Sequence, residues 1–152
     1  MNSSRKSTVK PGRLRSRNFA IEQLPGLSQD HLARLQAIGI TSTFHLLQQA
    51  WTTIGKEDLA RRISIHVQYV HKWVALADLA RVPAVGCQYC GLLLHAGVAK
   101  VEHLAALPVG QLHRQILKLQ VATFQRPDRC PTLGEVERWI QQAKSLLQTE
   151  AH

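Results

Sequence analysis

The sequence lacks any long apolar run. No segment approaches the roughly 18 continuous apolar residues of a membrane-spanning helix. Nothing near the N-terminus forms the apolar run of about seven residues or more that marks a secretory signal. We therefore expect a cytoplasmic protein without integral membrane association. An organelle transit peptide is a weaker alternative, because the N-terminal stretch is rich in Ser and Arg and free of acids but holds few apolar residues.

Enzyme signatures are missing as well. The chain has no P-loop, no HExxH pair, no nucleophile elbow and no Rossmann glycine fingerprint. We therefore expect no enzyme, no catalytic residues and no cofactor.

Cysteine is scarce. The chain has three cysteines, and an odd number in a chain with 45% hydrophobic residues indicates free thiols in a reducing compartment. Cys87 and Cys90 form the only CxxC, whereas zinc sites usually pair two such knuckles or add two spaced histidines. Cys130 and His95 complete a ligand set only if a long loop folds back. Redox activity of the CxxC is a further alternative, but a redox CxxC normally lies in a thioredoxin-like βαβ unit, which this chain lacks. We expect Cys90 to pack in the core and no metal site to form.

Acids are absent from the first 17 residues, which carry six bases. The whole chain has a formal charge of +9, so the remaining 135 residues hold 13 bases against 10 acids and are nearly balanced. We expect residues 1–19 to form a disordered basic tail that binds an anionic partner, either nucleic acid or an acidic protein. The bases of this tail are Arg5, Lys6, Lys10, Arg13, Arg15 and Arg17.

Residues 21–47 repeat as residues 79–105. One ungapped offset of 58 places Pro25 on Pro83 and Gly39 on Gly97. It also places Leu32 on Cys90 and His45 on His103. Such internal similarity predicts a duplicated structural unit.

A second offset, of 66, aligns the next part of the two copies and places Trp73 on Trp139. The difference of eight residues indicates an insertion in the second copy, in the loop from Phe124 to Pro131. The sequence therefore predicts one domain over residues 20–148. Its two units cover about 20–78 and 79–148.

No window alternates with period two, whereas apolar residues recur at helical spacing, so we expect an all-α fold. Ser28 is an expected N-cap, Gly39 an expected turn with positive φ, and Thr132 with Glu135 an expected capping box. Helices are expected over residues 28–38, 42–51, 56–63, 67–80, 86–96, 100–107, 109–123 and 132–147. We expect all three tryptophans, Trp51, Trp73 and Trp139, to lie in the core or between helices, and His45 and His103 to face solvent.

Two short segments resemble the helix–hairpin–helix signature: Leu24-Pro25-Gly26-Leu27-Ser28 and Val82-Pro83-Ala84-Val85-Gly86. With the stretch from Trp73 to Val98 and the C-terminal segment around Trp139, residues 20–147 resemble an uncharacterised bacterial domain family of tandem helix–hairpin–helix units. The resemblance implies sequence-independent DNA binding, in which hairpin amides donate to a phosphate and glycines permit close approach. The hairpin candidates for phosphate are Gly26, Leu27, Ser28, Ala84, Val85 and Gly86.

Both hairpins depart from the signature. Ser28 replaces the second glycine of the first hairpin, and Asp30 follows, where its charge would repel a phosphate. Ala84 replaces the first glycine of the second hairpin, which keeps Gly86. The alternative is that the hairpins only pack helices together. Arg126 and Arg129, in the inserted loop, are further candidates for a contact.

Two functions follow from these observations. The first is non-enzymatic, sequence-independent nucleic-acid binding through the basic tail, with the second hairpin as a possible phosphate contact. The second is a protein-interaction adaptor in which the hairpins serve only as scaffold.

Overall fold

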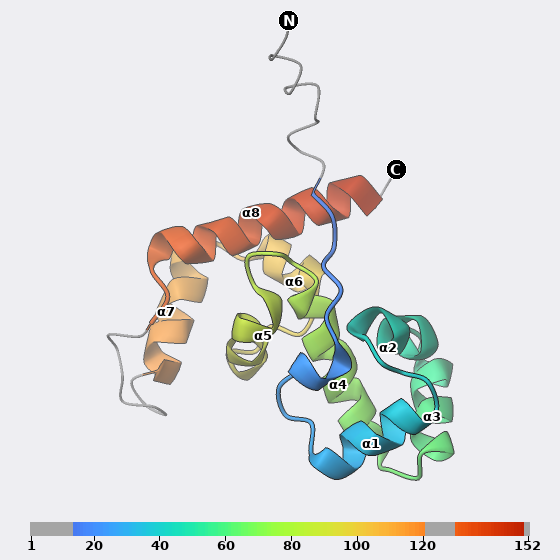
Figure 1. Cartoon of the computed structure of the whole chain (residues 1–152). Helices are drawn as coiled ribbons and strands as arrows, with labels where there is room; N and C mark the ends of the chain where they lie inside the picture. The colour runs from blue at the N-terminus through green and yellow to red at the C-terminus, as the bar shows by residue number, and fades with distance from the viewer. Residues whose placement is uncertain (1–13, 121–129, 151–152) are drawn as a thin grey trace, which may run out of the picture.

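The computed structural model describes residues 14–120 and 130–150, and over these residues the all-α expectation is confirmed (Figure 1). The described residues form no strand, only an isolated bridge between Ala20 and Ser42. Arg5, Lys6, Lys10, Arg13, Arg126 and Arg129 lie outside the described residues. The elements are η2 (Ile21–Gln23), α1 (Gln29–Ala37), α2 (Thr43–Ala50), α3 (Thr53–Arg62), α4 (Val67–Ala80), α5 (Gly86–His95), α6 (Val101–Ala106), α7 (Val109–Leu119) and α8 (Leu133–Glu150).

The helix ends follow from local chemistry. Ser28 caps α1 by accepting a hydrogen bond from the His31 amide at 3.0 Å. Thr132 and Glu135 form the expected capping box at α8, with each side chain accepting from the other residue's amide. Gly39 ends α1 at φ +87°, a conformation that disfavours residues with a Cβ atom. These three local predictions are confirmed.

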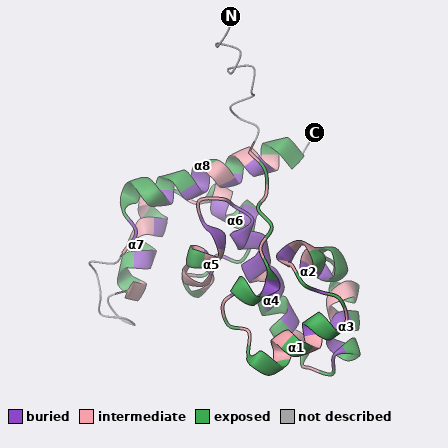
Figure 2. Ribbon diagram, viewed as in Figure 1, coloured by how far each residue is buried: buried purple, intermediate pink, exposed green. Residues whose placement is uncertain are grey.

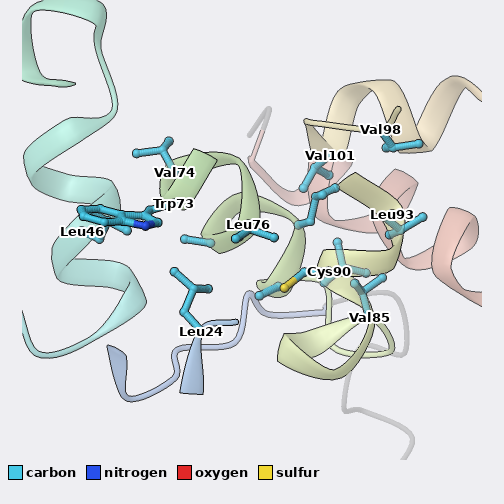
Figure 3. Close-up of a cluster of buried hydrophobic side chains, with 14 of the residues drawn as sticks. Leu24, Leu46, Trp73, Val74, Leu76, Val85, Cys90, Leu93, Val98 and Val101 are labelled. Carbon is cyan, nitrogen blue, oxygen red and sulfur yellow. The ribbon is translucent and has the colours of Figure 1, made fainter. Parts of the chain in front are cut away.

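Helix α4 runs through the middle of the molecule. It packs against α2 and α3 with its first half and against α5 with its second half, whereas α6 and α7 pack on α8 (Figure 1). All residues from Leu76 to Ala80 are buried (Figure 2). Four of these five residues are apolar and the fifth, Asp78, is itself buried, so this stretch of the helix lies inside the fold. Helix α4 therefore joins the two halves into one core (Figure 3).

The two halves have corresponding geometry at the two sequence offsets. The Ile40 amide donates to the Leu35 carbonyl at 3.0 Å, and the Val98 amide donates to the Leu93 carbonyl at 2.9 Å. Gly97 has φ +96°, close to the value at Gly39. The same turn thus closes α1 and α5.

The aromatic residues of the long helices also correspond. The ring of Trp73 lies 5.3 Å from that of His31, and the ring of Trp139 lies 4.9 Å from that of Tyr89. Trp73 and Trp139 are 0% and 1% exposed, as expected. The prediction for Trp51 is wrong, because its side chain is 53% exposed at the end of α2.

Residues 14–19 lie against the helical body, although the sequence assigned them to the tail. The Arg17 amide donates to the Arg81 carbonyl at 2.9 Å. Phe19 and Thr43 exchange two bonds, because the Phe19 amide donates to the Thr43 hydroxyl at 3.0 Å and the Thr43 amide donates to the Phe19 carbonyl at 2.8 Å. These bonds occupy backbone groups that a free tail would give to water. The structured part of the chain thus begins before residue 20.

A buried ion pair lies where the two halves join. Arg81 Nε donates to Asp78 Oδ1 at 2.7 Å, and the Val101 amide donates to Asp78 Oδ2 at 2.9 Å. Arg81 also donates to the Ser16 hydroxyl at 3.1 Å and to the Glu150 carboxylate. Burial by itself lowers the pKa of Arg81, but the carboxylates of Asp78 and Glu150 outweigh burial and raise this pKa above its ordinary value. Arg81 therefore stays charged at neutral pH.

Asp78→Ala removes the acceptor for two buried donors, the Arg81 guanidinium and the Val101 amide. Breaking a buried pair from one side costs about 3–5 kcal/mol. We expect a loss of that size in the free energy of unfolding, measured by urea denaturation.

Asp58→Ala is the matched control, because Asp58 pairs with Arg61 at 3.0 Å on the exposed face of α3. Its cost should stay below about 1 kcal/mol. Equal losses in the two variants would contradict the structural importance of the buried pair.

Candidate functional site

The first hairpin presents unpaired backbone donors. Gly26 has φ +82° and is exposed, as is Ser28. Among the hydrogen bonds between described residues, none uses the amides of Gly26, Leu27 or Ser28. These amides immediately precede α1, whose N-terminus carries partial positive charge. Three predicted phosphate candidates therefore have donors available for an anion.

Lys72 brings a positive charge to this hairpin. A Cβ atom placed on Gly26 would lie 3.5 Å from Lys72 Nζ, so the ammonium group sits against the glycine. Lys72 comes from α4 and forms no ion pair with another described residue. It also lines an open hollow of about 510 Å³ together with His66, Gln68 and Tyr69. The first hairpin thus places available backbone amides next to the Lys72 ammonium group, which itself borders a hollow that could hold a ligand.

Asp30 was expected to repel a phosphate here. In the structure, Arg34 Nε donates to Asp30 Oδ2 at 3.0 Å. The same guanidinium donates to the Ile63 carbonyl at 2.8 Å, which fixes its position. The pair is exposed and therefore contributes little to stability. It nevertheless places a compensating positive charge beside the carboxylate.

In the second hairpin, the backbone amides already donate hydrogen bonds within the fold. The Ala84 amide donates to Gln142 Oε1 at 2.7 Å. The amides of Val85 and Gly86 both donate to the Val82 carbonyl at 2.9 Å. Gly86 is buried, and a Cβ atom added to it would lie 3.4 Å from the Phe19 ring. The three predicted candidates Ala84, Val85 and Gly86 thus have no amide free for phosphate.

Two arginines lie around the second hairpin. Arg17 and Arg138 line a hollow of about 330 Å³ together with Ala84 and Gln142, with one acid, Glu135, on its wall. The Arg17 guanidinium lies 4.7 Å from the centre of the Phe19 ring. Arg15 is exposed on the same N-terminal segment.

Sequence reasoning missed Lys72 and Arg138 as bases of the two hairpins. Each comes from the long helix of its own half, so it lies more than 40 residues along the chain from the hairpin beside it. The sequence offset of 66 aligns Lys72 with Arg138. This alignment was the one sign in the sequence that the two residues have equivalent positions. Their shared placement beside corresponding hairpin positions became visible only in three dimensions.

The described residues thus define a small all-helical domain with two unlike hairpins. A family described as "Domain of unknown function (DUF4332)" matches residues 25–146, which is most of the chain, and the protein belongs to this family. No curated protein and no solved structure matches the chain. Within the described ranges, no helix is long and apolar enough to cross a membrane.

Two cysteines, Cys87 and Cys90, follow the second hairpin in the first turns of α5. Burial, aided by Cys87, raises the pKa of the Cys90 thiol to about 12. Burial also raises the pKa of Cys87, although Arg17 opposes the shift. Protonated thiols are poor nucleophiles and poor metal ligands. Cys90 is fully buried, as predicted, and residues 14–120 and 130–150 hold no group of three potential metal ligands.

The raised pKa of Cys90 predicts a loss of stability at alkaline pH. The unfolded thiol ionises near its ordinary pKa of 9.0, whereas the folded thiol stays protonated to about pH 12. The folded state therefore holds more protons between these values, and the free energy of unfolding falls as the pH rises through them. Urea denaturation from pH 8 to 11 should show a shallower fall for Cys90→Ala than for the wild type. Cys87→Ala, the control, should keep most of the fall, and identical pH profiles for Cys90→Ala and the wild type would refute the assignment.

Proposed function

We propose that this protein binds nucleic acid without sequence specificity and without catalysis, through tandem helix–hairpin–helix units of which the first makes the phosphate contact. One observation carries the proposal: the amides of Gly26, Leu27 and Ser28 have no partner among the described residues, and the Lys72 ammonium group lies beside them. Backbone amides at a helix N-terminus together with a lysine bind a phosphate of any nucleotide. Such contacts give affinity but read no base.

The N-terminal segment adds charge to the same molecule. Arg15 and Arg17 lie on a segment that hydrogen bonds to Arg81 and Thr43, so their positions relative to the helices are fixed. Residues 1–13 carry four further bases and precede Arg15 and Arg17 in the sequence. Bases that replace counterions along a phosphate backbone supply most of non-specific affinity. The second hairpin then contributes side chains, not amides.

A protein-interaction adaptor is the second candidate. The second hairpin favours it, because its amides bind Gln142 and Val82 and Phe19 covers Gly86. A hairpin of this kind packs helices together and needs no ligand. The basic segment would then bind an acidic protein surface. Partners that stay bound to the full chain after nuclease treatment favour the adaptor, and partners that are lost favour nucleic acid.

Lys72→Gln tests the first hairpin. Losing one phosphate contact should weaken binding similarly for unrelated duplex sequences and make the slope of log K against log salt shallower by about 0.9. Fluorescence anisotropy of a labelled random duplex at several salt concentrations measures both effects.

Lys144→Gln is the matched control, since it removes the same charge from an exposed position on α8 away from both hollows. Its salt slope should equal that of the wild type. If both lysine variants weaken binding equally, only net charge matters and the hairpin contact is excluded.

Deleting residues 1–13 tests the N-terminal bases. The deletion removes Arg5, Lys6, Lys10 and Arg13 and keeps the segment that packs on the body. If all four bases contact phosphates, the salt slope should become shallower by about 3 to 4. An unchanged slope in the same anisotropy titration would show that these residues do not contact the nucleic acid.

A further inference from the structure

Trp51 is the exposed tryptophan of this protein. Its side chain is 53% exposed, whereas Trp73 and Trp139 are 0% and 1% exposed. An indole ring is the largest apolar side chain, so leaving it in water forgoes a considerable gain in free energy. Neither the hairpins nor the core explains its position at the end of α2.

Trp51 lines a hollow between the two halves of the molecule. The hollow has a volume of about 520 Å³, which suits a ligand of the size of a nucleotide. Lys56 of α3 and His71 of α4 come from the first half. Lys100 and Glu102, at the start of α6, come from the second half, and Val74 of α4 adds an apolar surface.

Two lysines, Lys56 and Lys100, and two acids, Asp78 and Glu102, line the hollow. Lys56 Nζ donates to the backbone carbonyl of Trp51 at 3.0 Å, which fixes the ammonium group at the end of α2. Lys56 and Lys100 form no ion pair within the described part of the chain. Asp78 also lines the hollow, but both of its oxygens already accept hydrogen bonds, from Arg81 and from the Val101 amide. Glu102 is therefore the one acid on the wall without such compensation among the described residues.

We propose that this hollow binds an unpaired base of a nucleic acid strand, which stacks on Trp51 while the adjoining phosphates lie near Lys56 and Lys100. The inference rests on the nucleic-acid binding proposed above and extends it to single strands. An aromatic face flanked by cations is the common arrangement for such strands, since every base has a π-face. Glu102 disfavours a bare phosphate ion, so the aromatic contact is essential. A base stacked inside a duplex has no free face to offer.

Trp51→Ala tests the stacking contact. Stacking of a base on an aromatic side chain is worth enough that its loss should weaken binding of a labelled 20-residue oligo(dT) at least about 5-fold in fluorescence anisotropy. Affinity for a duplex of equal length should not change. Oligo(dT) should also quench the tryptophan fluorescence of the wild type, and the quenching should vanish in Trp51→Ala because the other two indoles are buried.

Ile54→Ala is the matched control, because Ile54 is 78% exposed close to Trp51 and lies outside the hollow. This variant should bind oligo(dT) like the wild type, and Trp51→Phe, which keeps an aromatic face, should recover part of the affinity. Thermal unfolding establishes that each variant is folded.

The outcomes separate the two proposals. If the wild type binds both nucleic acids and Trp51→Ala binds oligo(dT) equally tightly, the stacking site is overturned and the proposed function stands. If neither nucleic acid binds at low salt, both proposals fail. If dTMP quenches the fluorescence but oligo(dT) does not bind, the hollow is a mononucleotide site, and the strand proposal is overturned.

Discussion

The structure depends on one buried ion pair, Asp78 with Arg81, at the end of α4. Two charges leave water there, at a cost that only complete hydrogen bonding offsets. Asp78 accepts from Arg81 and from the Val101 amide, and Arg81 reaches Ser16 and Glu150. The pair therefore ties the central helix to α6, to the N-terminal segment and to the end of α8.

The two hairpins share a sequence pattern but differ in what they offer to a ligand. Lys72 of α4 lies beside the open first hairpin, whose amides lack partners among the described residues. Phe19 and Gln142 fill the corresponding space of the second hairpin. Phe19 takes this position because its own backbone is bonded to Thr43. The first segment thus has amides that can bind an anion, whereas the second serves packing.

Local chemistry was predictable from the sequence, and contacts between distant segments were not. The cap at Ser28 and the turn at Gly39 depend on residues within five positions of one another. Such local patterns can therefore be recognised in the sequence. From the sequence, we expected the Gly86 amide to be free for a ligand and Asp30 to obstruct one. Phe19 and Arg34 change both conclusions through contacts that no periodicity encodes. Trp51 was expected in the core or between helices because it falls within an apolar helix stripe like the two buried tryptophans, although it is 53% exposed.

The central claim is that the first hairpin, not the second, contacts the phosphate backbone. Amide chemical shifts of the ¹⁵N-labelled full chain, recorded while a short duplex is added at low salt, test it directly at single residues. The account predicts that the amides of Gly26, Leu27 and Ser28 shift progressively, whereas those of Val85 and Gly86, already bonded to Val82, stay unchanged. Binding that shifts Val85 and Gly86 and leaves Gly26 unmoved would contradict it.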